Sequence, residues 1–162
     1  MTQSSTPLLV PALGIGFVAG LRSFTAPAAV SWAAHLGWLN LDGSPLGFMG
    51  SPAAVAIFSI LAVAEYVADK LPRTPNRTTP GPLIGRIVMG GLSGACIGVS
   101  AGQLLVAGMV LGGIGGVIGA FVGYEARRRL VRGLKVKDVV IAVGEDLVAI
   151  GLAYFLVFFR AS

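Results

Sequence analysis

Long apolar segments separated by short polar ones make up almost the whole chain. A helix needs about 20 apolar residues to cross the ~30 Å hydrocarbon core of a bilayer. Five segments approach that length: residues 8–35, 52–71, 83–99, 104–124 and 139–159. The pattern predicts an all-α fold, a polytopic transmembrane helical bundle of about five spans. We expect residues 1–162 to form a single transmembrane domain.

Two of the boundaries depend on residues that interrupt helices. Residues 8–35 are too many for one straight crossing, and Pro27 removes a helical hydrogen bond and clashes with the carbonyl of Ser23. We therefore expect a kinked first span, with the kink in residues 22–27. The polar residues 100–103 divide the long apolar stretch in the middle of the chain into the third and fourth spans.

The composition excludes an ordinary soluble domain. Hydrophobic residues make up 55% of the chain and charged residues only 12%, about half the charged fraction of a soluble domain. The net charge of +5 does not indicate nucleic-acid binding, because the basic residues lie at the ends of apolar segments without interleaved aromatic residues. Basic residues in such places set the orientation of membrane helices.

The basic residues fall on one side of the predicted bundle. The loops after the second and fourth spans, with the flanking Lys70 and Arg86, hold ten of the twelve lysines and arginines, and the other loops between spans hold none. Short loops rich in lysine and arginine stay in the cytoplasm. The five-span pattern thus predicts a multi-pass membrane protein with the N-terminus in the cytoplasm and the C-terminus outside.

Glycines repeat along the third and fourth spans. In the third span they occur at every fourth residue, and the fourth span carries a matching set. The glycines concerned are Gly90, Gly94, Gly98, Gly102, Gly112, Gly116, Gly119 and Gly123. Glycine stripes let membrane helices approach closely, so we expect these two glycine-striped spans to pack together. A self-association face that makes the protein a homo-oligomer, or a slot for a ligand, is the open alternative.

Apart from Lys70 and Arg86 near the ends of their segments, five charged residues lie inside the apolar segments: Arg22, Glu65, Asp69, Glu145 and Asp146. A charge at the centre of a membrane costs ~2.5–3.5 kcal/mol, so we expect these residues to meet. Arg22 would be the one deep cation, paired with one carboxylate, and another carboxylate would be protonated. The group would form a polar centre or a pathway for an ion or small solute. Purely structural ion pairs, or side chains that reach the interface, are the open alternatives.

Basic residues surround the proline-rich loop at residues 72–82. Lys70, Arg73, Arg77 and Arg86 are candidates for contacts with anionic lipid headgroups, each contributing ~1 kcal/mol near a membrane surface. The alternative is that these residues only set the topology.

Signals for catalysis and metal binding are few. The chain has one histidine and one cysteine, Cys96, and it has no nucleophile elbow and no cluster of nitrogen or sulfur ligands. We therefore predict no catalytic residue, no metal site and no cofactor, and we favour a protein that is not an enzyme.

Three motifs resemble those of one bacterial membrane family. They are GLRSFTAP at residues 20–27, EYVADKLP at residues 65–72 and GED at residues 144–146. With these motifs the chain resembles, over most of its length, the family filed as domain of unknown function 4126. The resemblance implies a small multi-span inner-membrane protein and brings no activity with it.

The charges inside the spans favour a small channel or transporter for an ion or small solute. The first alternative is an enzyme or binding protein for a membrane lipid, which would use the same carboxylates with the basic loop. The second alternative is a structural or assembly subunit of the membrane. The expected partners are the lipid bilayer, including anionic lipids, and a solute; nucleic acid is not among them.

Overall fold

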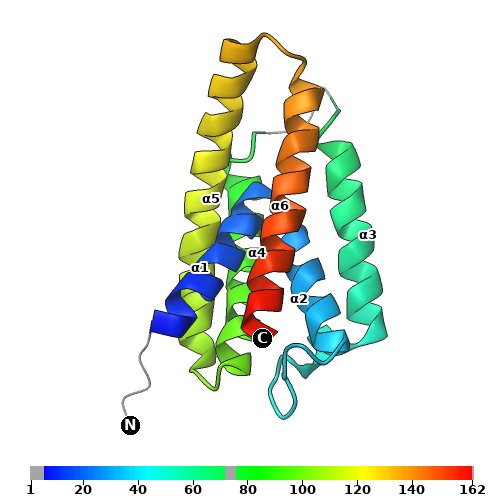
Figure 1. Cartoon of the computed structure of the whole chain (residues 1–162), viewed down its shortest axis with the longest axis vertical. Coiled ribbons are helices and arrows are strands. Elements are labelled where there is room, and N and C mark those ends of the chain that lie inside the picture. Colours follow the sequence, from blue (N-terminus) through cyan, green and yellow to red (C-terminus); the bar gives the residue numbers. More distant parts are fainter. Residues whose placement is uncertain (1–5, 72–75, 162) are drawn as a thin grey trace.

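The chain folds into helices. The structure, a computed structural model, describes residues 6–71 and 76–161, and no β-strand occurs among them. In chain order the helices are α1 (Thr6–Leu21), α2 (Thr25–His35), the short 3₁₀ helix η1 (Gly47–Gly50), α3 (Pro52–Ala68), α4 (Pro80–Ser100), α5 (Leu105–Leu134) and α6 (Asp138–Ala161). The α-helices form an elongated bundle (Figure 1).

Three helices of the described residues are long and apolar enough to cross a membrane: α4, α5 and the part of α6 from Asp138 to Phe158. Two further apolar helices are shorter, Leu9–Leu21 within α1 and the whole of α3. The prediction of a helical membrane protein is thereby confirmed in outline. The predicted five spans are not, because the first of them, residues 8–35, is divided between α1 and α2.

Glycines let α1, α4 and α5 pack with their backbones in contact. A Cβ added at Gly112 of α5 would overlap the carbonyl of Gly90 and lie 2.9 Å from Cα of Gly94, both in α4. A Cβ added at Gly16 of α1 would overlap the carbonyl of Gly112. No side chain fits between these helices, so glycine is required at the points where they meet. The sequence did not predict that α1 shares this contact.

The remaining glycines of the two predicted stripes are not all alike. Those at which an added Cβ would press on another helix or on its side chains are Gly98, Gly116, Gly119 and Gly123. Gly102 differs, because it lies in the turn after α4 with a φ of +67° and a Cβ there would meet nothing within 4 Å. The contact face of α4 therefore ends at Gly98, and Gly102 serves the turn instead of the packing predicted for it.

The chain reverses direction between α1 and α2. Arg22, just after α1, donates a hydrogen bond to the carbonyl of Ala142 near the start of α6. Trp38, just after α2, packs against Phe158 near the end of α6, with the ring centroids 5.9 Å apart. The two helices thus finish at opposite ends of α6 and form an antiparallel hairpin (Figure 1).

This hairpin corrects the predicted first span, which was expected to cross the membrane once with a kink. Pro27 is the third residue of α2, where the backbone N–H has no partner within the helix, so the proline fits the start of a new helix. With the reversal, the described start of α1 and end of α6 lie at the same end of the bundle (Figure 1). The predicted placement of the two termini on opposite sides came from treating the hairpin as one span and does not fit this arrangement.

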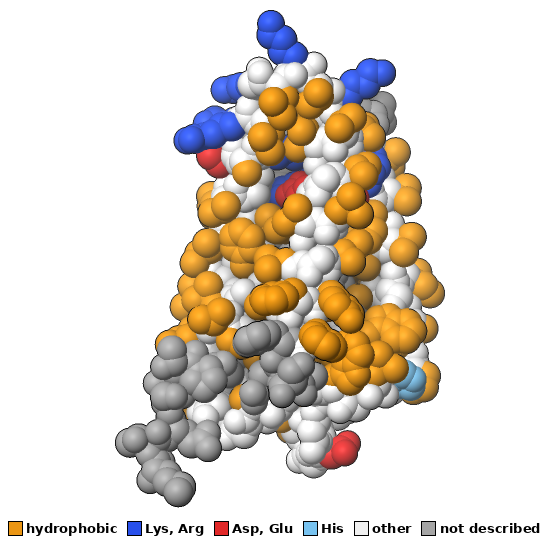
Figure 2. Space-filling model, in the orientation of Figure 1, with side chains coloured by type: hydrophobic (Ala, Val, Ile, Leu, Met, Phe, Trp, Pro, Cys, Tyr) orange, Lys and Arg blue, Asp and Glu red, His pale blue; other side chains and the backbone are white. Residues whose placement is uncertain are grey.

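One end of the bundle is strongly basic. α5 has 30 residues and is therefore ~45 Å long, which exceeds the ~30 Å thickness of the hydrocarbon core. Lysine and arginine side chains gather where α5 and α6 project beyond the other helices, and hydrophobic side chains cover the flanks below (Figures 1 and 2). We refer to this as the basic end.

Candidate functional site

The tip of the α1–α2 hairpin is bound by two charged side chains from other helices. Glu65 of α3 accepts hydrogen bonds from the backbone N–H groups of Ser23 (2.8 Å) and Phe24 (3.0 Å). Arg86 of α4 donates through Nη1 to the carbonyl of Gly20 at 2.7 Å. Backbone groups freed by a helix break must find partners inside the protein when water is absent. Glu65 and Arg86 thus stabilise the reversal of the chain.

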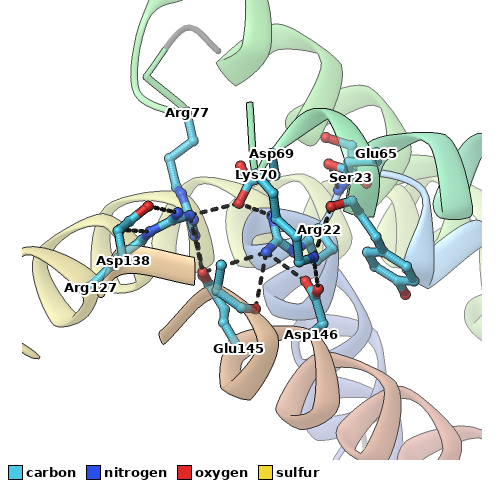
Figure 3. A network of polar contacts seen from close by, with 12 residues as sticks. Arg22, Ser23, Glu65, Asp69, Lys70, Arg77, Arg127, Asp138, Glu145 and Asp146 are labelled. Atoms are coloured by element: carbon cyan, nitrogen blue, oxygen red, sulfur yellow. Dashed lines mark hydrogen bonds and ion pairs between the residues drawn. The ribbon is translucent and has the colours of Figure 1, made fainter. Parts of the chain in front are cut away.

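Arg22 lies at this tip and is completely buried. Its Nη1 lies 2.6 Å from Oδ2 of Asp69, and its Nη2 lies 2.5 Å from Oδ1 of Asp146. Oε2 of Glu145 is farther away, 3.8 Å from Nη2. The planar guanidinium therefore joins the hairpin to α6 and to the end of α3 through two different carboxylates (Figure 3).

Each of these two aspartates also contacts a second cation. Nζ of Lys70 lies 2.7 Å from Oδ2 of Asp146, and Nη1 of Arg127 lies 2.6 Å from Oδ2 of Asp69. Asp69 and Asp146 therefore each lie between two cations, which compensates the cost of holding a carboxylate away from water.

Two bidentate pairs extend the network towards the basic end. Arg77 binds both carboxylate oxygens of Glu145, with Nη2 2.9 Å from Oε2. Arg127 binds Asp138 at the start of α6, through Nε at 2.9 Å and Nη2 at 2.5 Å. Paired N–H···O contacts of this kind are the strongest and most directional that arginine makes with a carboxylate.

We call the whole network the ion-pair cluster. Its members are Arg22, Glu65, Asp69, Lys70, Arg77, Arg86, Arg127, Asp138, Glu145 and Asp146. Five cations face five carboxylates, so the formal charge of the cluster is zero. It connects the hairpin with α3, α4, α5, α6 and the loop between α3 and α4 (Figure 3).

The structure brings the five residues predicted as a polar centre into this one cluster. It does not leave Arg22 as the one deep cation, because the side chains of Arg77 and Arg86 are also buried, at 6% and 7% exposure. Every carboxylate of the cluster has a cation beside it, so nothing in the contacts requires the protonated carboxylate that was expected. Whether the cluster forms a pathway stays a prediction.

Three of the four residues predicted to contact lipid headgroups bind within the protein. Lys70 binds Asp146, Arg77 binds Glu145, and Arg86 binds the hairpin tip. Arg73 lies outside the described residues. Headgroup contact by these residues stays a prediction.

Arg127 was not predicted as a site residue. It belongs to a run of three arginines that reads as a topology signal. The signal that could have found it is the excess of carboxylates over cations inside the apolar segments, since buried carboxylates need further cations.

Two cavities are lined by residues of the cluster or by their neighbours in the chain. The first, of about 400 Å³, opens at the basic end, and its lining includes Asp69, Arg77 and Arg127. The second, of about 320 Å³, lies between α2 and α6, extends from Trp38 to Thr25 and is almost wholly apolar. Thr25 Oγ1 and the Tyr66 hydroxyl, 2.6 Å apart, are the polar groups at its inner end.

Some buried hydrogen-bond donors of the cluster have no acceptor among the described residues. Nε of Arg22 and Nε of Arg86 are buried and have no hydrogen-bond partner among the described residues. Donors of this kind suit an anion or water. No group of three or more histidine, cysteine, aspartate or glutamate side chains in the described part of the chain is arranged to hold a metal ion.

Comparison with known proteins identifies a family without an assigned activity. No curated protein and no solved structure matches the chain. One family model, described as a domain of unknown function (DUF4126), matches residues 9–160. This agrees with the resemblance carried by the motifs around Arg22, Glu65 and Glu145. Since the match covers nearly the whole chain, the protein belongs to the DUF4126 family.

Proposed function

We propose that the protein is a channel or transporter for an ion or small solute, with the ion-pair cluster as the closed barrier. The observation that supports this is the position of the two cavities. The cavity at the basic end reaches Asp69, and the cavity between α2 and α6 reaches Thr25. Arg22 lines neither cavity, but it binds Asp69 of the first, and Thr25 of the second begins the helix that follows its turn. In this proposal the buried ion pairs around Arg22 form the barrier between the two spaces.

The shared carboxylates give the barrier a means of opening. Asp69 contacts Arg22 and Arg127, and Asp146 contacts Arg22 and Lys70. A carboxylate that lies between two cations stays compensated when one of them moves away. A charged solute or ion that enters from either cavity can therefore replace one partner without leaving a buried charge alone.

The helix ends that meet at the hairpin tip support the same proposal. Transporters commonly place their substrate site where a membrane helix is interrupted, because the free ends of the half-helices face the site. Here the helix ends meet at the hairpin tip, residues 20–24, and backbone groups of the tip bind charged side chains of the cluster.

Flux measurements in proteoliposomes test this function. We would compare the wild type with Glu65→Gln and Glu145→Gln, for protons, common ions and small organic anions. Glu125→Gln is the matched control, because Glu125 pairs with Arg128 and Arg129 on the surface of α5, outside the cluster.

We expect flux in the wild type and the control, and its loss in both cluster variants while they remain folded. Absence of flux for all these solutes in folded wild-type protein, or equal flux in all four proteins, would contradict the proposal.

The basic end would face the cytoplasm of a bacterial inner membrane, because lysine- and arginine-rich segments stay on that side. The start of α1 and the end of α6 would then lie outside. Labelling of intact cells with an impermeant thiol reagent tests this, in a Cys96→Ser background. Asp42→Cys should react and Lys135→Cys should not; the reverse pattern would overturn the orientation.

A further inference from the structure

We propose that the basic end carries a specific binding site for an anionic phospholipid of the cytoplasmic leaflet. The phosphate would occupy the cavity of about 400 Å³ at the basic end. An acyl chain would occupy a groove of about 390 Å³ between α5 and α6. This cavity is also the cytoplasmic entrance of the proposed pathway, so a bound lipid would lie at that entrance. The lining of the cavity and the groove support the lipid site by themselves, so it stands whether or not the protein transports a solute.

The cavity has an excess of positive charge. Among the described residues, four arginines line it, against two aspartates, which leaves a formal excess of two positive charges in this part of the lining. Its charged lining consists of Arg77, Arg127, Arg128, Arg132, Asp69 and Asp138. Asn76 and Tyr124 add neutral hydrogen-bonding groups. A cavity of this composition favours an anion with several acceptor oxygens, as phosphate has.

Two of the four arginines can supply that excess charge to a ligand. Arg77 and Arg127 are already bound bidentately to carboxylates of the cluster. Arg132 is exposed and has no ion pair with any carboxylate of the described residues. Arg128 is 46% exposed and pairs with Glu125 of its own helix, a contact that contributes little at such exposure. Arg128 and Arg132 are therefore the principal phosphate contacts.

The cavity lies at the level of lipid headgroups. α5 begins at Leu105, and about 20 residues of helix cross the hydrocarbon core. Residues 127–132 therefore lie just beyond the core, where phosphates are found. Basic pockets between helices at this level are typical sites for anionic headgroups.

The adjoining groove explains why the ligand is a lipid and not free phosphate. Apolar side chains of α1, α5 and α6 line its walls, and Arg127 and Glu145 lie at its charged end. Figure 2 shows this recess, where red and blue atoms are visible between hydrophobic side chains below the basic end. Arg127 lines both the groove and the cavity, so a phosphate and an acyl chain of one molecule meet at this residue.

Binding in neutral detergent micelles tests the charged half of the site without the surface potential of a membrane. The probes are a short-chain phosphatidylglycerol, the phosphatidylcholine of the same chain length, and inorganic phosphate, each titrated into purified protein. The variant is Arg128→Gln/Arg132→Gln. The control, Lys135→Gln/Lys137→Gln, loses the same charge from the same end of the bundle, at residues that do not line the cavity.

We expect phosphatidylglycerol to bind more tightly than phosphatidylcholine, and the arginine pair variant to lose about tenfold or more in affinity. The affinity of the lysine pair variant should stay within a factor of about two of the wild-type affinity, which is about 0.4 kcal/mol. Equal losses in both variants, or equal binding of the two lipids, would overturn the proposal. Arg132→Gln alone serves the same purpose if the double variant does not fold.

A second variant tests the groove. Gly144 lines it, and a Cβ there would meet nothing within 4 Å, so Gly144→Leu fills the groove without a backbone clash. Gly151→Leu is the control, on the same helix and also in open space, but outside the groove. Gly144→Leu should weaken phosphatidylglycerol binding, and Gly151→Leu should not. If inorganic phosphate binds as tightly as the lipid, and Gly144→Leu leaves lipid binding as unchanged as Gly151→Leu does, the site serves free phosphate and the lipid proposal is refuted.

Discussion

Arg22→Ala is the substitution with the largest expected effect on stability. Arg22 is fully buried, and its two Nη atoms reach two different aspartates, Asp69 and Asp146. Removing one partner of a buried ion pair costs ~3–5 kcal/mol, because the remaining charge is left uncompensated. Here each aspartate keeps a second cation, Arg127 or Lys70. We therefore expect the lower end of that range, about 3 kcal/mol, or roughly a 150-fold change in the folding equilibrium constant.

Equilibrium unfolding in mixed detergent micelles measures this change. Arg22→Lys should lose less than Arg22→Ala, because one ammonium keeps the charge but reaches only one of the two aspartates. Arg129→Ala is the control, because Arg129 is 78% exposed and pairs with Glu125 on the surface of its own helix, and it should leave the unfolding midpoint unchanged. A loss for Arg22→Ala below about 1 kcal/mol, the value of an exposed pair, would contradict the role assigned to the cluster.

Two further substitutions test how the helices are joined. Gly94→Ala should destabilise the protein by about 1–3 kcal/mol, since its Cβ would lie 2.7 Å from Cα of Gly112. In the control Gly85→Ala, on the same helix, the Cβ meets nothing within 4 Å, so this change should be neutral or stabilising. Equal unfolding midpoints for the two variants would refute the packing argument. Glu65→Ala should leave the N–H groups of Ser23 and Phe24 without their acceptor, at about 1–3 kcal/mol for each group. Hydrogen exchange at these two amides should accelerate strongly, and unchanged protection would show that Glu65 does not stabilise the tip.

The meeting of charges was predictable because a charge in an apolar segment needs a partner wherever the helices go. Arg22, Glu65, Asp69, Glu145 and Asp146 stand out in the sequence for this reason, and all five lie in the cluster. A charged side chain needs a partner of opposite charge whenever it lies in an apolar environment, and each apolar segment of the sequence shows by itself which charged side chains it contains.

The reversal at the hairpin tip was not predictable in the same way. An apolar run of 28 residues that contains two prolines, Pro11 and Pro27, is compatible with a kinked crossing, a break or a turn. What selects the turn is Glu65 on α3 and Arg86 on α4, which bind the freed backbone groups. These contacts are tertiary, so no pattern within residues 8–35 reveals them, and the mistaken single first span follows from this one segment.

The cluster also has a consequence for how the chain is made. Arg22 leaves the ribosome early, whereas Ala142, whose carbonyl it binds, comes 120 residues later, a delay of roughly 6–24 s at ~5–20 residues per second. Until α6 is synthesised and inserted, Arg22 lacks Asp146, and Arg77 lacks Glu145. In a chain that stops before α6, Arg77 lacks its carboxylate partner Glu145 and Arg22 keeps only Asp69. The charges of the cluster are therefore balanced only when the last helix is complete.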